Sequence, residues 1–252
     1  MKLGAQFYTL RDNCTTLDGL SESLKRVADI GYTTVQLSGV CPYEPEWVKE
    51  ELDKNGLRCV LTHWNVDEVK NDPVSVLNKH RAFGCNNIGI GCMPGWPNEE
   101  NTYKFIEEFK KPTQILAQNG SKLFYHNHHG EFIRCADGEM VFDKLINSFT
   151  KDELAFTLDT YWVQMGGGDV NEWLEKLKGR VECIHLKDLE MVGTEQRMAP
   201  IGQGSMNFEK IVASAIDAGT QYALVEQDNC YGRDPFECLK QSYEYLKSLG
   251  LN

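Results

Sequence analysis

Residues 17–38 read LDGLSESLKRVADIGYTTVQLS, and this stretch holds one complete structural unit. From Leu17 to Ile30, apolar residues recur every three or four positions, which is typical of a helix with one buried face. Gly31 follows as a stop, since glycine readily takes the left-handed conformation found just past a helix end. The next short run, Thr33–Ser38, is rich in β-branched residues and predicts a strand.

The same alternation of short strand and longer helix recurs along the whole chain. We expect strands at Leu3–Tyr8, Thr33–Ser38, Leu57–His63, Asn87–Cys92, Lys122–His128, Leu154–Trp162, Val181–Asp188 and Tyr222–Asp228. Further helices are expected at Pro45–Asn55, Pro73–Phe83, Asn98–Asn119, Met140–Phe149, Val170–Leu177, Phe208–Ala218 and Pro235–Leu249. Regular alternation predicts a parallel sheet, and eight such units predict closure into a (β/α)₈ TIM barrel. The length of 252 residues, near the roughly 250 of such a barrel, predicts a single domain over residues 1–252.

An open, doubly wound sheet is the main alternative to the barrel. Such a sheet usually carries a glycine-rich phosphate loop directly after its first strand. The segment that follows Phe7 here, Tyr8–Asp12, contains no glycine. The barrel is therefore the favoured architecture.

Composition excludes several classes of partner. The formal net charge of −11, without a run of Lys or Arg, argues against nucleic acid as a partner. We expect neither an export signal nor a membrane span, because charged residues interrupt the start of the chain and no long apolar run follows. Nine cysteines without a CxxC pair favour a reducing cytoplasm. No nicotinamide or flavin motif occurs, and a homo-oligomer is left open.

Polar residues collect where the predicted strands end, which is the rim that carries the active site of such barrels. They are Gln6, Tyr8, Gln36, His63, His126, His128, Glu131, Asp159, His185, Lys187, Asp188, Glu226 and Asp228. Carboxylates and imidazoles gathered in one place are costly unless they are paired or bind a metal ion. Because no thiolates cluster with them, the set suits a hard or borderline divalent cation: Mn²⁺, Mg²⁺, Co²⁺ or Zn²⁺.

Several of these residues lie in segments that resemble the xylose isomerase-like sugar phosphate isomerases/epimerases. The matching segments are FYHNHHGEF at 124–132, LDTYW at 158–162 with GGGD at 166–169, HLKD at 185–188, PIGQG at 200–204 and VEQD at 225–228. The resemblance implies one divalent metal ion, with Mn²⁺ as the first choice, held by Glu131, Asp159, His185 and Glu226. Asp228 is an alternative ligand to Glu226, and Glu131 sits later than the corresponding glutamate of many epimerases.

The resemblance implies a metal-dependent aldose–ketose isomerase or ketose 3-epimerase that acts on a sugar or keto-sugar through an enediolate. Glu131 and Glu226 are then the candidates that move the proton, with His128 as an alternative base. Substrate contacts are assigned to His63, His126, Trp162, Lys187 and Asp188. For Lys187, a salt bridge with Asp188 is the competing interpretation.

Two other functions are compatible with the same residues. The first is a metal-dependent lyase or dehydratase acting on a keto-sugar, keto-cyclitol or 3-keto-glycoside, in which His126 and His128 serve as an acid/base pair. It shares the first step with an isomerase, but a β-substituent leaves instead of a proton returning. The second is a non-catalytic sugar-binding barrel, against which the four converging ligands argue. Fold alone does not decide between them.

Overall fold

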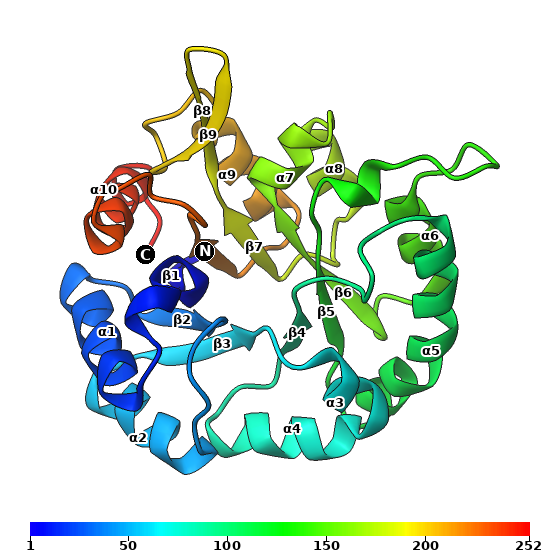
Figure 1. The fold of residues 1–252 in the computed structure, drawn as a ribbon, viewed down its shortest axis with the longest axis horizontal. Helices are drawn as coiled ribbons and strands as arrows, with labels where there is room; N and C mark the ends of the chain where they lie inside the picture. Colours follow the sequence, from blue (N-terminus) through cyan, green and yellow to red (C-terminus); the bar gives the residue numbers. More distant parts are fainter.

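The computed structural model describes residues 1–252, and its centre is a parallel eight-stranded sheet (Figure 1). The strands are β1 (Lys2–Gln6), β2 (Thr34–Leu37), β3 (Arg58–Thr62), β4 (Ile88–Ile90), β5 (Leu123–His126), β6 (Leu154–Asp159), β7 (Cys183–Leu186) and β10 (Tyr222–Val225). They pair in the order β3-β2-β1-β10-β7-β6-β5-β4. The chain's first strand therefore lies between its second and its last, as a barrel requires.

The barrel closes between β3 and β4. His63, directly after β3, forms a parallel bridge with Gly89 of β4. The Trp64 amide also donates a hydrogen bond of 2.8 Å to the Gly89 carbonyl. The predicted (β/α)₈ barrel is confirmed by this pairing around the full circle of strands.

The helices ring the outside of the barrel (Figure 1). The eight expected helices are α1 (Leu17–Ile30), α2 (Pro45–Lys54), α4 (Pro73–Ala82), α5 (Glu99–Gln118), α6 (Val141–Ser148), α8 (Val170–Lys176), α9 (Phe208–Asp217) and α10 (Pro235–Ser248). The bounds of α1 are those predicted: Thr16 caps its start by accepting a hydrogen bond of 3.1 Å from Gly19 N. Gly31 ends it in the left-handed conformation, at φ 119°.

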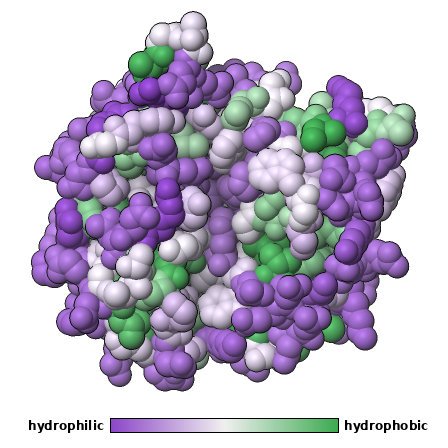
Figure 2. All heavy atoms as spheres, viewed as in Figure 1, coloured by the Kyte–Doolittle hydropathy of each residue, from purple (hydrophilic) through white to green (hydrophobic).

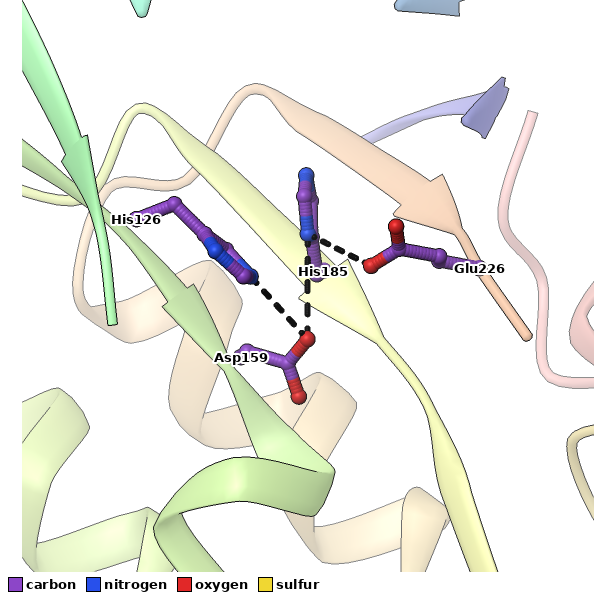
Figure 3. A group of neighbouring side chains, drawn as sticks. All are labelled: His126, Asp159, His185 and Glu226. Atoms are coloured by element: carbon purple, nitrogen blue, oxygen red, sulfur yellow. Dashed lines mark hydrogen bonds and ion pairs between the residues drawn. The ribbon is translucent and has the colours of Figure 1, made fainter. Parts of the chain in front are cut away.

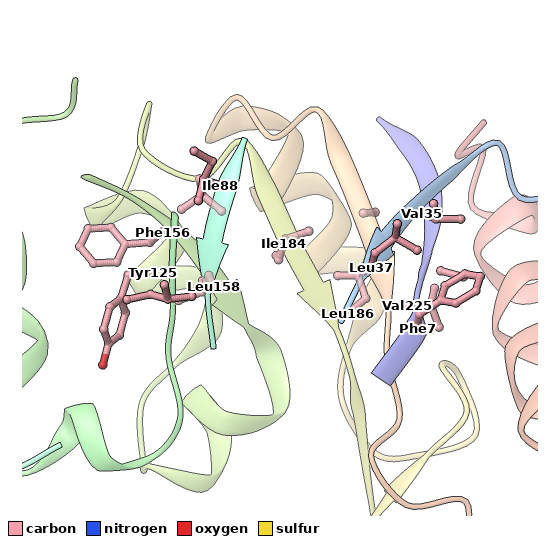
Figure 4. Close-up of a cluster of buried hydrophobic side chains, with 14 of the residues drawn as sticks. Phe7, Val35, Leu37, Ile88, Tyr125, Phe156, Leu158, Ile184, Leu186 and Val225 are labelled. Atoms are coloured by element: carbon pink, nitrogen blue, oxygen red, sulfur yellow. The ribbon is translucent and has the colours of Figure 1, made fainter. Parts of the chain in front are cut away.

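Two apolar layers hold the barrel together. A small cluster of buried residues fills the lumen: Val60, Leu61, Phe124, Ala155, Cys183 and Leu224. A much larger cluster lies between strands and helices, and Figure 4 shows part of it, including Tyr125 and Phe156. Because successive side chains of a strand point to opposite faces, Phe124 belongs to the first layer and its neighbour Tyr125 to the second.

Several elements differ from the sequence prediction. The segment after residue 188, for which no helix or strand was predicted, is an antiparallel hairpin of β8 (Asp188–Val192) and β9 (Glu195–Ala199), which projects from the barrel in Figure 1. The strand expected to reach residue 162 ends at Asp159, because Asp159 starts helix α7 (Thr160–Met165) by accepting a hydrogen bond from Trp162 N. A short helix α3 (Val66–Asn71) and 3₁₀ helices at Phe7–Asn13 and Gly130–Phe132 were not predicted.

The bridge between β3 and β4 leaves no room for a side chain at position 89. A Cβ at Gly89 would lie 2.3 Å from the backbone oxygen of Thr62, which cannot move without opening the barrel. Gly89→Ala should therefore lower the free energy of unfolding by about 3 kcal/mol, measured by urea denaturation. Gly91→Ala is the matched comparison, since its nearest neighbour would be a side-chain atom 3.3 Å away. Equal losses in the two variants would contradict the tight closure.

The outer surface is mostly hydrophilic on the face shown in Figure 2. No helix of the structure combines the length and the apolar character needed to cross a membrane. All nine cysteines are free thiols.

Candidate active site

Four buried side chains converge at the carboxyl ends of neighbouring strands (Figure 3). His126 ends β5, Asp159 ends β6, His185 lies in β7, and Glu226 follows β10. Their ligating atoms all lie within 4.8 Å of one another. His126 Nε2 is 3.2 Å from Asp159 Oδ2, while His185 Nδ1 is 3.0 Å from Glu226 Oε2 and 3.7 Å from Asp159 Oδ2.

Hydrogen bonds outside the cluster fix both imidazoles. His126 Nδ1 lies 3.0 Å from the carbonyl oxygen of Gly91, and His185 Nε2 lies 2.7 Å from Gln36 Oε1. Since a carbonyl oxygen only accepts, each of these nitrogens carries the proton in the tautomer that the hydrogen-bond network assigns. The other nitrogen of each ring therefore points its lone pair into the cluster.

The two carboxylates are fixed in the same way. Asp159 Oδ1 accepts a hydrogen bond of 3.0 Å from Trp162 N, and Glu226 Oε1 accepts one of 2.6 Å from Gln6 Nε2. Each carboxylate thus keeps one oxygen, Asp159 Oδ2 and Glu226 Oε2, directed at the histidines.

This arrangement fits a divalent metal ion. His185 Nδ1 and Glu226 Oε2 are buried atoms without any hydrogen bond, although they face each other. Neighbouring ligands at about 2.1 Å from an octahedral ion lie about 3 Å apart, close to two of the three separations above. Although burial alone would raise the pKa values of Asp159 and Glu226, the adjacent Lys187 ammonium holds both below their usual range. Both groups are therefore anionic, as metal ligands must be.

Lys187 lies at the centre of the acidic groups and is only 1% exposed. Its Nζ is 3.0 Å from Asp159 Oδ2, 2.9 Å from Glu226 Oε2 and 2.9 Å from Asp228 Oδ1. It does not pair with Asp188, which was the competing interpretation. The carboxylate of Asp188 instead accepts hydrogen bonds from the backbone amides of Leu189, Gly202, Gly204 and Met206. Asp188 thus anchors a turn and does not line the cavity above the cluster.

Glu131 lies outside the cluster of four. The 3₁₀ helix at Gly130–Phe132 turns its side chain back toward β5. There Oε1 accepts a hydrogen bond of 2.7 Å from the Tyr125 hydroxyl, and Oε2 accepts one of 2.8 Å from His128 N. Of the expected ligands, the structure brings together Asp159, His185 and Glu226, and the fourth side chain of this cluster is that of His126, not Glu131.

Burial raises the pKa of Glu131 to about 7 from 4.5, despite the two hydrogen bonds that lower it. The folded protein thus keeps a proton that the unfolded chain loses between these values, so stability falls as the pH rises through this interval. Glu131→Gln cannot ionise. The free energy of unfolding of this variant, measured with urea, should therefore rise by about 2 to 3 kcal/mol relative to that of wild type between pH 5 and pH 8. The surface substitution Glu100→Gln serves as the control, and a Glu131→Gln difference that stays constant with pH would contradict this account.

A cavity of about 560 Å³ opens above the cluster. Six of the expected site residues line it: His63, His126, His128, Trp162, Lys187 and Glu226. Gln6, Tyr8, Trp96 and Asp228 line it as well. Among the residues assigned to the site from the sequence, Glu131, Asp159, His185 and Asp188 are buried behind this lining.

Two histidines that line the cavity each have a ring nitrogen without a hydrogen-bond partner. His63 Nε2 and His128 Nδ1 are buried without a hydrogen-bond partner. The ring of His128 lies between Trp96 and Trp162, with centroid distances of 5.1 and 5.3 Å. Burial lowers the pKa of His128 to about 3 and that of His63 well below its usual value. Both rings are therefore uncharged at neutral pH, and each has one ring nitrogen without a hydrogen-bond partner.

Gln6 contacts Glu226 and Gln36 contacts His185. Neither glutamine was assigned a role from the sequence, although both stand among the polar residues at strand ends. Gln36→Met would remove the acceptor that fixes the His185 tautomer. Loss of such an outer contact typically weakens metal binding about 10- to 100-fold. Calorimetric titration of Mn²⁺ should show this loss. Gln221→Met, at an exposed position directly before β10, is the control. Unchanged affinity in Gln36→Met would mean that the contact does not orient a ligand.

The fold and the cluster together define a (β/α)₈ barrel whose buried histidine and carboxylate residues could hold a metal ion. The chain belongs to the xylose isomerase-like TIM barrel family, whose sequence profile it matches over residues 24–249. Among curated proteins, it is 28% identical to an inosose dehydratase of Geobacillus kaustophilus, over 90% of this chain and 86% of that protein.

Solved structures show the same fold. A sugar phosphate isomerase/epimerase from Parabacteroides distasonis superposes with a TM-score of 0.82 and 25% identity, covering 98% of this chain and 93% of the other. The probable 3-DHS dehydratase AsbF from Bacillus anthracis superposes with a TM-score of 0.76 and 14% identity, covering 98% and 99% of the two chains. Relatives named as isomerases and as dehydratases thus share this barrel.

Proposed function

We propose that this protein is a divalent-metal-dependent lyase that eliminates a β-substituent, water in the simplest case, from a keto-cyclitol or keto-sugar. The observation that carries the proposal is the composition of the cavity. Glu226 is the only glutamate that lines the cavity, whereas His63 and His128 each offer a ring nitrogen without a hydrogen-bond partner. An epimerase that uses two metal-bound glutamates would need a second one here, and the Glu131 side chain is held elsewhere by Tyr125 and His128.

His126, Asp159, His185 and Glu226 would hold the ion, for which Mn²⁺ is our first choice. When bound, such an ion polarises a carbonyl oxygen and stabilises the negative charge that develops on it. We expect the keto group of the substrate to enter the cavity toward this cluster. Trp162, which lines the cavity, would pack against the C–H face of the ring.

Proton transfer is assigned to the two free histidines. His128 accepts the proton from the carbon next to the carbonyl, and the C–O bond at the following carbon then breaks. The proton that His128 has taken up passes, with His63 as the relay, to the departing hydroxyl, which leaves as water and gives an α,β-unsaturated ketone. His126 is less suited to this second role, because one of its nitrogens is bonded to the Gly91 carbonyl and the other faces Asp159.

An aldose–ketose isomerase or ketose 3-epimerase is the second candidate. It would share the first proton transfer, and the Parabacteroides distasonis structure named as a sugar phosphate isomerase/epimerase supports it. In an isomerase, His128 would return the proton to the neighbouring carbon. In an epimerase, Glu226 would deliver a proton to the opposite face of the same carbon.

Mass analysis of the products separates the two candidates. The Mn²⁺-loaded protein would be incubated in deuterated water with an inosose and with a panel of free and phosphorylated keto-sugars. The lyase predicts a product that has lost the mass of water. A product that keeps the substrate mass apart from incorporated deuterium would instead identify an isomerase or epimerase.

A further inference from the structure

The ammonium of Lys187 contacts the same oxygens that face the two histidines of the cluster. Asp159 Oδ2 lies 3.0 Å from Lys187 Nζ and 3.2 Å from His126 Nε2. Glu226 Oε2 lies 2.9 Å from Lys187 Nζ and 3.0 Å from His185 Nδ1. The remaining oxygens of both carboxylates are engaged by Trp162 N and Gln6 Nε2. A metal ion and the ammonium therefore have the same two oxygens available to them.

We infer that Lys187 is an internal stand-in cation, which neutralises Asp159 and Glu226 when no metal is bound and withdraws toward Asp228 when a metal binds. The inference rests on the metal site of the proposed function, but not on the reaction. Lys187 would then set the affinity for the metal, in addition to facing the substrate cavity.

Asp228 is suited to receive the ammonium. It accepts the one side-chain hydrogen bond that Lys187 Nζ makes, at 2.9 Å, whereas the contacts to Asp159 and Glu226 are ion pairs without hydrogen-bond geometry. Its side chain is 24% exposed, compared with 0% for Asp159 and 4% for Glu226. The ammonium can thus leave the two inner oxygens while it keeps a carboxylate partner.

In the metal-free protein, the buried carboxylates of Asp159 and Glu226 need a positively charged neighbour. Buried carboxylates without a counter-ion are strongly destabilising, and Asp159 and Glu226 lie within one small cluster. A divalent ion would supply the missing charge but would repel an ammonium a few ångströms away. The two cations therefore compete, and removal of one should strengthen the binding of the other.

The test is calorimetric titration of Mn²⁺ into chelator-treated wild type, Lys187→Met, Asp228→Asn and the control Lys122→Met. Lys122 pairs with Glu182 at 2.8 Å, away from the site. Lys187→Met should bind Mn²⁺ at least about tenfold more tightly and, without metal, should unfold at a lower temperature than wild type. Asp228→Asn should bind more weakly, because the displaced ammonium loses its partner. The control should match wild type.

Equal or weaker Mn²⁺ binding by Lys187→Met would overturn the inference, because Lys187 would then hold the carboxylates in place beside the metal. Absence of Mn²⁺ binding in every protein would overturn the metal site itself, and with it the proposed function. A second measurement avoids dependence on variants that fold poorly. In wild type, the ¹⁵N resonance of the Lys187 ammonium should shift when diamagnetic Mg²⁺ is added, and an unchanged resonance in the Mg²⁺-bound protein would also overturn the inference.

Discussion

The double variant Asp159→Asn/His185→Ala is expected to lose its bound metal ion and at least about a thousandfold of its turnover. Both side chains place a ligating atom in the cluster of four, so the double variant keeps only His126 and Glu226. Changes to residues that only orient a ligand already cost about 10- to 100-fold in affinity, so loss of two direct ligands must cost more. Metal content would be measured by plasma mass spectrometry on protein purified without chelator, together with turnover of the substrate found by mass analysis.

This variant should still fold. The amide that replaces the Asp159 carboxylate can accept the same hydrogen bond from Trp162 N that starts α7, because asparagine caps helices about as well as aspartate does. Asp53→Asn/His129→Ala alters the same residue types outside the cluster and is the matched control. Metal content equal to wild type in Asp159→Asn/His185→Ala would show that the ion is bound elsewhere.

His128→Gln is expected to reduce turnover about 10²- to 10⁴-fold, the usual contribution of one general base, while leaving the metal content unchanged. His128 lines the cavity with an unpartnered Nδ1 but contributes nothing to the cluster of four. Steady-state kinetics and metal analysis on the same preparation separate these effects.

His129→Gln is the control for this second variant. The ring of His129 lies between Trp96 and Trp162 as well, at 5.4 and 5.3 Å, yet it does not line the cavity. It should retain nearly all activity. If both variants lost activity equally, packing between the two tryptophans would be the cause, and His128 would not be the base.

The architecture could be predicted from the sequence because its signals are local. Helix α1 is an example: its apolar spacing and the glycine after it lie within residues 17–31, and its bounds were predicted without error. The hairpin of β8 and β9 was missed, because a projecting ribbon with exposed Met191 and Val192 buries no continuous apolar face. Its strands therefore lack the pattern by which buried strands are recognised.

The site could be predicted only in part. Asp159, His185 and Glu226 converge because parallel strands end at one rim, which strand order alone implies. Glu131 follows its strand by five residues, and its direction depends on a 3₁₀ turn that has no clear sequence signal. The sequence alone could have argued against a salt bridge between Lys187 and Asp188. Neighbouring residues at the end of a strand face opposite sides, so an inward Lys187 cannot easily meet an outward Asp188.

Formation of the unsaturated ketone from an inosose, followed by its ultraviolet absorbance, tests whether the protein is a metal-dependent lyase. The wild-type protein loaded with Mn²⁺ should form this product, the chelator-treated protein should not, and added Mn²⁺ should restore the rate. Asp159→Asn/His185→Ala should stay inactive at the same Mn²⁺ concentration. Equal rates with and without metal, or substrate that exchanges its α-proton without ever losing water, would contradict a metal-dependent lyase.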